Sequence, residues 1–198
     1  MERTLQTREI KDEVMRTNIV NMYNSAFAGT DDVCIQDQIC YDTSTLDSAL
    51  LDSDYLKFVL LLNDEVVGLC LLTNNLVKAR IAYCNDRYLR QRFPNYTALG
   101  KLFYVTCICV LPEMQSRGVG MELIKSVTKF IFETGTMVCF DFSEEKNPGL
   151  TTLIQHVAKT QVGNRENTGE DRDYWADEIP LGSQRYTSLH CNKFGIPD

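Results

Sequence analysis

The sequence predicts a mixed α/β (α+β) domain in which a central β-sheet is flanked by helices. Two segments with apolar residues at three- and four-residue steps predict helices, several short apolar runs predict strands, and the two kinds of segment alternate along the chain. With 198 residues, of which 44% are apolar and 24% charged, the composition is that of an ordinary globular protein. We therefore expect one domain over residues 1–198.

The first half of the chain predicts two helices and a hairpin. Apolar side chains recur on one helical face over residues 9–27. A short helix is expected over residues 46–51, with a hydroxyl residue among 43–45 as its N-cap. Residues 58–62 and 66–72 form two apolar runs, and the Asn and Asp between them favour a tight turn, so they predict an antiparallel hairpin.

The second half predicts strands and helices in alternation. In chain order we expect a central strand, a helix, a buried strand, a helix and a final pair of strands, at residues 102–111, 117–133, 137–142, 148–157, and 174–179 with 186–194 as an edge strand. Pro112 ends the central strand because proline cannot donate to a ladder, and Gly135 stands at a C-cap position. The pattern of residues 74–100 assigns no element.

Charge and residue pattern exclude several classes of function. A net charge of -7 and a pI near 4.9 argue against nucleic-acid binding and favour a cationic small molecule as partner. The N-terminal residues lack the apolar core of a signal peptide and no run is long enough to span a membrane, so we expect a cytoplasmic protein with no membrane partner.

Cysteine and histidine placement predicts no metal site and no disulfide framework. The eight cysteines include no C-x-x-C pair and several lie in apolar runs, which is typical of buried reduced thiols. His156 and His190 have no second ligand at metal-binding spacing.

The most informative segment joins the central strand to the following helix. Gly118 and Gly120 place unobstructed backbone amides at a helix N-terminus, an arrangement that binds pyrophosphate. The segment lacks both the Gly-Lys-Ser/Thr of a P-loop and the glycine spacing of a dinucleotide fingerprint. The alternative is a plain strand-to-helix turn whose glycines serve close packing.

This segment resembles the acyl-CoA motif of the GNAT superfamily of N-acetyltransferases. The pattern Gln115-x-x-Gly118-x-Gly120, preceded by Val110 and a proline, carries the resemblance, which extends over residues 9–163 in element order. It implies the GNAT fold, acetyl-CoA as cosubstrate and an amine as acceptor. It also implies a set of cofactor-binding residues: Ile108, Cys109 and Val110 for the pantetheine arm, Gln115, Ser116, Arg117, Gly118, Val119, Gly120 and Met121 for the pyrophosphate, and Asn147 near the pantetheine.

The catalytic residues are less well marked. Many relatives have a Glu or His base at the positions of Tyr104 and Thr106, and many have a tyrosine acid in a later helix; neither is present here. Tyr104 could relay a proton through water or simply line the site. Phe27 followed by Asp31-Asp32 is similar to arylalkylamine N-acetyltransferases, which makes Asp32 a candidate base. A non-catalytic acyl-CoA-binding or regulatory module is the alternative.

An acidic stretch adds a charge argument. Residues 17–56 contain no Lys or Arg but seven aspartates: Asp31, Asp32, Asp37, Asp42, Asp47, Asp52 and Asp54. By the resemblance this segment borders the acceptor pocket, where a negative field would attract a cationic amine. The alternative is a solvated acidic loop.

Overall fold

The computed structural model describes residues 2–28, 41–79, 86–115, 117–143, 174–181 and 184–191, and for 141–143, 174–181 and 184–191 it describes the backbone alone. The chain divides into two compact units. The first unit contains Met1–Ala82 and Thr106–Leu123, and the second contains Tyr83–Val105 and Ile124–Asp198. The single-domain expectation stays a prediction.

The described elements follow the predicted alternation closely. In chain order they are β1 (Glu2–Thr7), α1 (Glu13–Ala26), α3 (Thr43–Leu51), β2 (Tyr55–Leu62), β3 (Glu65–Thr73), α4 (Asp86–Arg92), α5 (Pro94–Ala98), β4 (Leu102–Val110), the 3₁₀ turn η1 (Pro112–Met114), α6 (Val119–Thr134), β5 (Met137–Ser143), β6 (Tyr174–Leu181) and β7 (Gln184–Cys191). The predicted helix at residues 148–157 lies outside the described residues.

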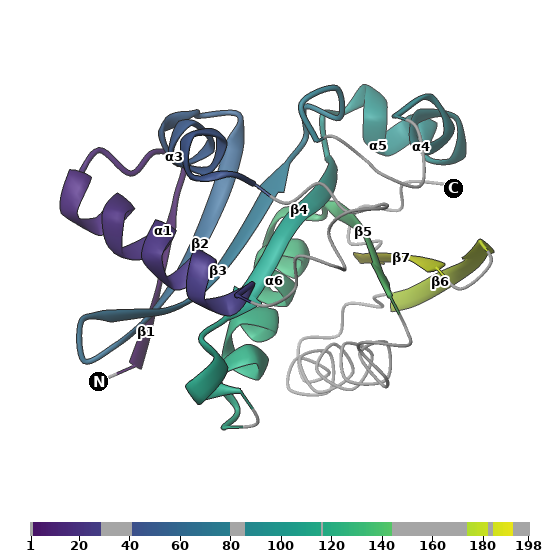
Figure 1. Ribbon diagram of the computed structural model, residues 1–198. Helices are drawn as coiled ribbons and strands as arrows, with labels where there is room; N and C mark the ends of the chain where they lie inside the picture. Colours follow the sequence, from purple (N-terminus) through teal and green to yellow (C-terminus); the bar gives the residue numbers. More distant parts are fainter. Residues whose placement is uncertain are drawn as a thin grey trace. The chain divides into compact units, whose positions relative to one another are not determined.

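The first unit is a sheet with one face covered by α1 and α3 (Figure 1). Its strand order is β1-β2-β3-β4, with β1–β2 and β2–β3 antiparallel. The core between sheet and helices includes Ile19 of α1, Leu46 of α3, Leu69 of β3 and Cys107 of β4. We did not predict β1, because its sequence ERTLQT has one large apolar residue and therefore no alternating pattern. It pairs on one side only, as an edge strand can.

The hairpin prediction is confirmed. The two predicted runs left residues 63–65 between them, but the observed turn has two residues, because Glu65 already belongs to β3. Only Asn63 and Asp64 separate β2 from β3, and their φ angles are 51° and 68°. Two consecutive positive φ angles are those of a type I′ connection, for which Asn-Gly is the preferred sequence. The second turn residue is therefore in a conformation that suits glycine better than aspartate.

Replacing Asp64 by glycine is expected to stabilise the protein by about 0.5 kcal/mol, because it removes the left-handed strain at that position. Asp64 also forms an ion pair with Arg3 at 3.0 Å, but both side chains are exposed and such pairs contribute little. Denaturant unfolding of Asp64→Gly measures the change. Arg3→Ala is the control, since it removes the same ion pair without changing the turn; an Asp64→Gly variant less stable than Arg3→Ala would contradict the assignment.

Aspartates begin both helices of the first unit. The Asp12 carboxylate accepts from the amides of Val14 and Met15, so α1 starts four residues later than the predicted residue 9. Asp42, rather than a hydroxyl residue among 43–45, is the N-cap of α3 and accepts from the Thr45 amide at 2.8 Å. That prediction was wrong because the aspartate precedes three hydroxyl residues and its charged acceptor forms the stronger bond.

The second unit has the strand order β4-β5-β7-β6. β4 and β5 are parallel, whereas β5–β7 and β7–β6 are antiparallel. The final pair of strands is confirmed, but β7 is not the edge strand that we predicted, because it lies between β5 and β6. The region 74–100, which the pattern left unassigned, contains α4 and α5, and Gly135 ends α6 with a φ of 59° as expected.

Candidate active site

The end of β4 leads into α6 through a short, internally bonded loop. The Leu111 amide donates to the Val67 carbonyl at 3.0 Å, which holds the end of β4 beside the beginning of β3. The η1 turn then closes with a bond from the Met114 amide to the Leu111 carbonyl at 2.9 Å, and the Gln115 amide donates to the Pro112 carbonyl at 3.2 Å. Backbone hydrogen bonds therefore hold the chain from Leu111 to Gln115.

The N-terminus of α6 presents backbone amides that the helix itself does not use. The bond of the Glu122 amide to the Gly118 carbonyl, at 3.2 Å, is the first of the α-helical pattern. The amides of Val119, Gly120 and Met121 precede it, so they have no acceptor within the helix. Such amides, reinforced by the helix dipole, are suited to an anion such as a pyrophosphate.

The two glycines of the motif have different roles. Gly118 has a φ of 84°, a conformation that favours glycine, and a Cβ added there would meet no atom of the described residues within 4 Å. A Cβ added at Gly120 would lie 3.8 Å from Val110 Cγ2, an ordinary packing distance. The open space at Gly118 supports the anion-cradle interpretation, and Gly120 also fits the packing alternative.

The backbone of β4 near the loop has one side turned to β3 and one side turned away. The Cys109 carbonyl lies 3.4 Å from a Cβ built on Gly68 of β3, and Leu111 donates to β3 as well. Because the direction of the backbone groups alternates along a strand, those of Ile108 and Val110 point away from β3. Ile108 is 43% exposed, so this part of the strand is accessible.

Three of the predicted site residues lie outside the described residues: Asp32, Ser116 and Asn147. Gln115, Arg117 and Gly118 are exposed at the loop, whereas Val119 is buried under it. Tyr104 belongs to the second unit, where it is paired with Cys139 of β5 and is only 2% exposed.

The thiols of β4 are packed in the core. Cys109 is buried with its Sγ 4.0 Å from Met22 Sδ, so it is not positioned as a nucleophile. A hydrogen bond with the neighbouring Cys109 thiol and, after it, burial raise the pKa of the Cys107 thiol. The four cysteines whose side chains are described are all free and buried, as predicted for those in apolar runs.

Four of the seven aspartates in the acidic stretch form hydrogen bonds or ion pairs with other groups of the protein. Asp42 caps α3, and Asp47 binds Arg16 of α1 at 2.8 Å. Asp52 and Asp54 both bind Lys78, at 2.6 and 2.7 Å, and their hydrogen bonds to it hold the pKa of each carboxyl below its usual range. These contacts favour a structural interpretation for the four; the other three aspartates lie outside the described residues.

Sequence reasoning missed a group of hydroxyls in the first unit. The Tyr41 amide donates to the Tyr23 hydroxyl at 2.9 Å, and burial raises the pKa of both phenols. The Thr106 hydroxyl lies near the Tyr41 hydroxyl and opposes that rise. No local pattern could have found this group, because Tyr23 lies on α1, Tyr41 just before α3, and Thr106 on β4.

Among the described residues, no helix has both the length and the apolarity needed to cross a bilayer. Over the same residues, no three His, Cys, Asp or Glu side chains are grouped so as to hold a metal ion.

A mixed sheet whose central strand runs into an amide-lined helix N-terminus is the arrangement that the acyl-CoA motif predicted. Residues 17–149, more than half of the chain, match the Acetyltransferase (GNAT) family. The chain therefore belongs to the GNAT family, and it is an acetyl-CoA-dependent N-acetyltransferase. The search against curated proteins finds no match.

Solved structures share this fold at low sequence identity. The ribosomal-protein-S18-alanine N-acetyltransferase from Escherichia coli has a TM-score of 0.54 at 12% identity, with 98% of this chain and 96% of that chain covered. Aminoglycoside 6'-acetyltransferase type Ii has a TM-score of 0.54 at 7% identity, with 96% of each chain covered. The loading GNATL domain of CurA from Lyngbya majuscula has a TM-score of 0.53 at 12% identity, covering 96% and 98%. These likenesses concern the fold alone.

Proposed function

We propose that this N-acetyltransferase acetylates a small cationic primary amine, such as an arylalkylamine, by direct attack of the amine on acetyl-CoA in a ternary complex. The observation that carries the acetyl-CoA half of this proposal is the set of amides at Val119, Gly120 and Met121, beside the open space above Gly118. The net charge of -7 supports a cationic acceptor. The family match supports transfer to an amine.

The cosubstrate would lie along the end of β4 and across the N-terminus of α6. The segment from Gln115 to Met121, Ser116 included, would bind the pyrophosphate, chiefly through the amides of Val119, Gly120 and Met121, with Arg117 adding positive charge. The Gln115 amide is already bonded to the Pro112 carbonyl. The outward backbone groups of Ile108 and Val110 would bind the pantetheine arm, whereas those of Cys109 between them face β3. Asn147 would contact the arm further along. The outward direction of the Ile108 and Val110 groups supports this placement, because they are turned away from β3.

The chemistry needs the acceptor to lose a proton before it attacks the thioester. Backbone amides near Val110 would polarise the thioester carbonyl, and positioning would supply most of the rate enhancement. We assign proton removal to Asp32, and a relay role to Tyr104. A phenol with an ordinary pKa near 10 is a weak base at neutral pH, so Tyr104 would pass a proton on rather than hold it.

A melting experiment tests the cosubstrate half of the proposal. Acetyl-CoA at about 100 times its dissociation constant is expected to stabilise the protein by about 2.7 kcal/mol, which raises the melting temperature by roughly 5 to 10 °C. Differential scanning fluorimetry with acetyl-CoA, free CoA and ATP measures this, with ATP as the nucleotide control. No rise with either CoA compound would refute the proposed site.

Turnover is then measured as release of the CoA thiol with a panel of amines. The panel contains an arylalkylamine, a polyamine, an amino acid, an aminoglycoside and a peptide with a free N-terminus, because the acceptors named for similar structures include an alanine of a ribosomal protein and aminoglycosides. We expect the arylalkylamine to have the highest kcat/KM. Binding of acetyl-CoA without turnover of any amine would favour a non-catalytic acyl-CoA-binding module instead.

A further inference from the structure

The Thr106 hydroxyl is an unusual feature of β4. Its Oγ1 atom is buried and makes no hydrogen bond of ordinary length to any described residue, although it lies close enough to the Tyr41 hydroxyl to lower the pKa of that phenol. A buried hydroxyl without a partner is unfavourable and therefore uncommon in folded proteins. The residue as a whole is partly exposed, so rotation about χ1, which exchanges the hydroxyl with the methyl group, can bring the hydroxyl to the accessible side.

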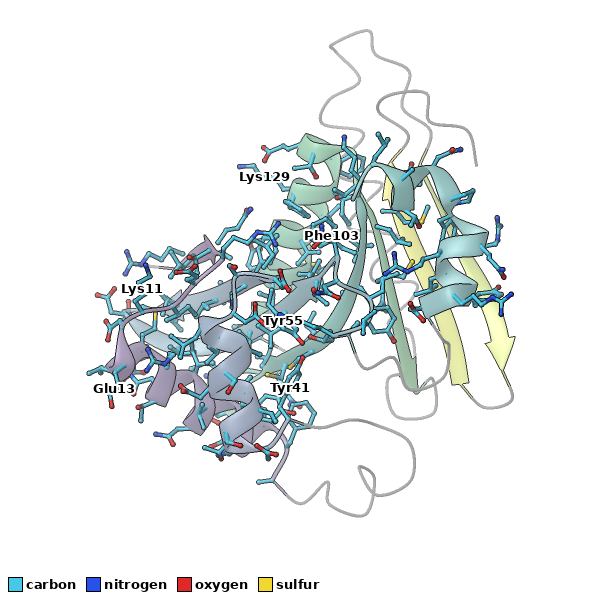
Figure 2. The ribbon with its side chains drawn as sticks, turned by 90° about the horizontal axis from the view of Figure 1, so that it is seen from above. Lys11, Glu13, Tyr41, Tyr55, Phe103 and Lys129 are labelled. Carbon is cyan, nitrogen blue, oxygen red and sulfur yellow. The ribbon has the colours of Figure 1, made fainter. Side chains whose placement is uncertain are left out.

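Tyr41 lies next to this hydroxyl and is held firmly in place. Its backbone amide donates to the Tyr23 hydroxyl at 2.9 Å, and the two rings meet edge to face with centroids 6.4 Å apart. The Tyr41 hydroxyl is near both Thr106 and Tyr55, and the Tyr55 hydroxyl donates to the Lys78 carbonyl at 3.0 Å. Figure 2 labels Tyr41, which precedes α3 in the chain, and Tyr55, at the beginning of β2.

Thr106 lies close to the proposed acyl-CoA site, because both are on β4, and Tyr41 approaches that strand at Thr106. Thr106 precedes Ile108 by two residues, which corresponds to about 7 Å along an extended strand. Both belong to the first unit, as do the loop and the N-terminus of α6. We infer that Thr106 and Tyr41 form the hydroxyl pair that hydrogen-bonds and orients the acceptor amine, an inference that rests on the proposed function.

The chemistry of the pair fits a neutral amine about to attack. Each hydroxyl oxygen can accept from an N–H of the acceptor, which gives Thr106 a hydrogen bond of ordinary length. Burial raises the pKa of Tyr41, so the phenol keeps its proton at neutral pH and is not the base. An uncharged pair stabilises the protonated form, which cannot attack the thioester, less than a carboxylate would.

Substitution at Thr106 separates this role from a structural one. Thr106→Val is expected to raise the KM for the acceptor about 10-fold, with the KM for acetyl-CoA unchanged and kcat changed less than 3-fold, because one hydrogen bond to the acceptor is lost. Thr106→Ser keeps the hydroxyl and should stay within 2-fold of the wild type. Tyr41→Phe should raise the same KM, and the double variant should show less than the product of the two effects.

The matched control is Thr73→Val in the same unit. The Thr73 hydroxyl is buried but fully used, since it donates to the Asp54 carbonyl at 2.9 Å and accepts from the Asn75 amide at 3.0 Å. This variant should lower the melting temperature by about 2 to 4 °C without changing the acceptor KM. Thr106→Val should melt no lower than the wild type, because the buried hydroxyl that it removes makes no hydrogen bond of ordinary length to a described residue.

The outcomes distinguish this inference from the proposed function. If the wild type acetylates an amine but Thr106→Val keeps its acceptor KM within 2-fold, the inference is wrong and the transferase proposal stands. If Thr73→Val raises the acceptor KM as much as Thr106→Val, the effect is structural and the inference is again wrong. If the wild type binds no acetyl-CoA, or acetylates no amine of the panel, the proposed function fails and the inference fails with it.

Discussion

Gly118→Val is expected to weaken acetyl-CoA binding about 100-fold, equivalent to about 2.7 kcal/mol. A β-branched residue is strongly disfavoured at a φ of 84°, so the backbone must turn and the amides of the first turn of α6 change direction. The new side chain also enters the open space above the loop, where the pyrophosphate would lie. At an acetyl-CoA concentration that raises the wild-type melting temperature by roughly 5 to 10 °C, the variant should gain only about 1 to 2 °C.

Gly100→Val is the matched control for backbone strain. Gly100 is also exposed and has a φ of 65°, but it belongs to the loop between α5 and β4. Both variants should lose about 1 to 2 kcal/mol of stability in the absence of cosubstrate. Only Gly118→Val should lose the response to acetyl-CoA; an equal response in the two variants would show that the glycine serves the turn and not the pyrophosphate.

Lys57→Met is expected to destabilise the protein by about 2 kcal/mol, a fall of roughly 4 to 8 °C in melting temperature. Lys57 of β2 has no exposed surface, and its ammonium donates to the carbonyls of Arg8 at 2.6 Å, Tyr55 at 2.9 Å and Asp52. Methionine has a similar length but donates to none of them. The lysine therefore joins the end of β1 to the segment between α3 and β2.

The same variant isolates a pH dependence. Burial disfavours the charged ammonium and lowers the pKa of Lys57 to about 8, although the neighbouring Asp52 acts in the opposite direction. The pKa in the unfolded chain is about 10.4, so between these two values the unfolded state binds more protons and stability rises with pH. From pH 7.5 to 9.5 the free energy of unfolding of the wild type should rise by about 1 to 2 kcal/mol relative to Lys57→Met.

Lys101→Met is the control for removing a lysine that donates to the backbone. The Lys101 ammonium donates to the Thr134 carbonyl at 2.9 Å from a partly buried position. Its loss should cost about 1 kcal/mol and should leave the pH dependence of the wild type in place. Urea unfolding of the three proteins at several pH values provides the comparison. A Lys57→Met protein as stable as the wild type, with the same pH profile, would refute the structural role of the three carbonyl bonds.

Much of the fold follows from local physical chemistry. The apolar run at residues 102–111 had to be a buried strand, and Pro112 ended it, as β4 confirms. The period of 117–133 predicted α6, and Gly135 ended the helix with a positive φ. Asn63 and Asp64 made the hairpin turn for the same reason, because short-range sterics decide which residues accept a positive φ.

The candidate cosubstrate site also follows largely from the sequence. Its loop, from Gln115 to Gly120, lies between one strand and one helix that are adjacent in the chain, so the motif and its structural context could be recognised together. The structure adds the reason for each glycine: a positive φ at Gly118 and contact with Val110 at Gly120. It also shows that the Ile108 and Val110 backbone groups face away from β3.

The tertiary structure alone decided what depends on distant parts of the chain. Nothing in the sequence ERTLQT indicates a strand; β1 forms because β2 offers it a complete set of backbone partners. The acidic stretch was ambiguous until Asp47 was found beside Arg16 and Asp52 beside Lys78, which no local pattern pairs. Likewise Thr106 meets Tyr41, and Lys57 meets the Arg8 carbonyl, only after the chain has folded. Periodicity and turn chemistry act over a few residues, whereas hydrogen bonds and burial between distant segments exist only in the folded chain.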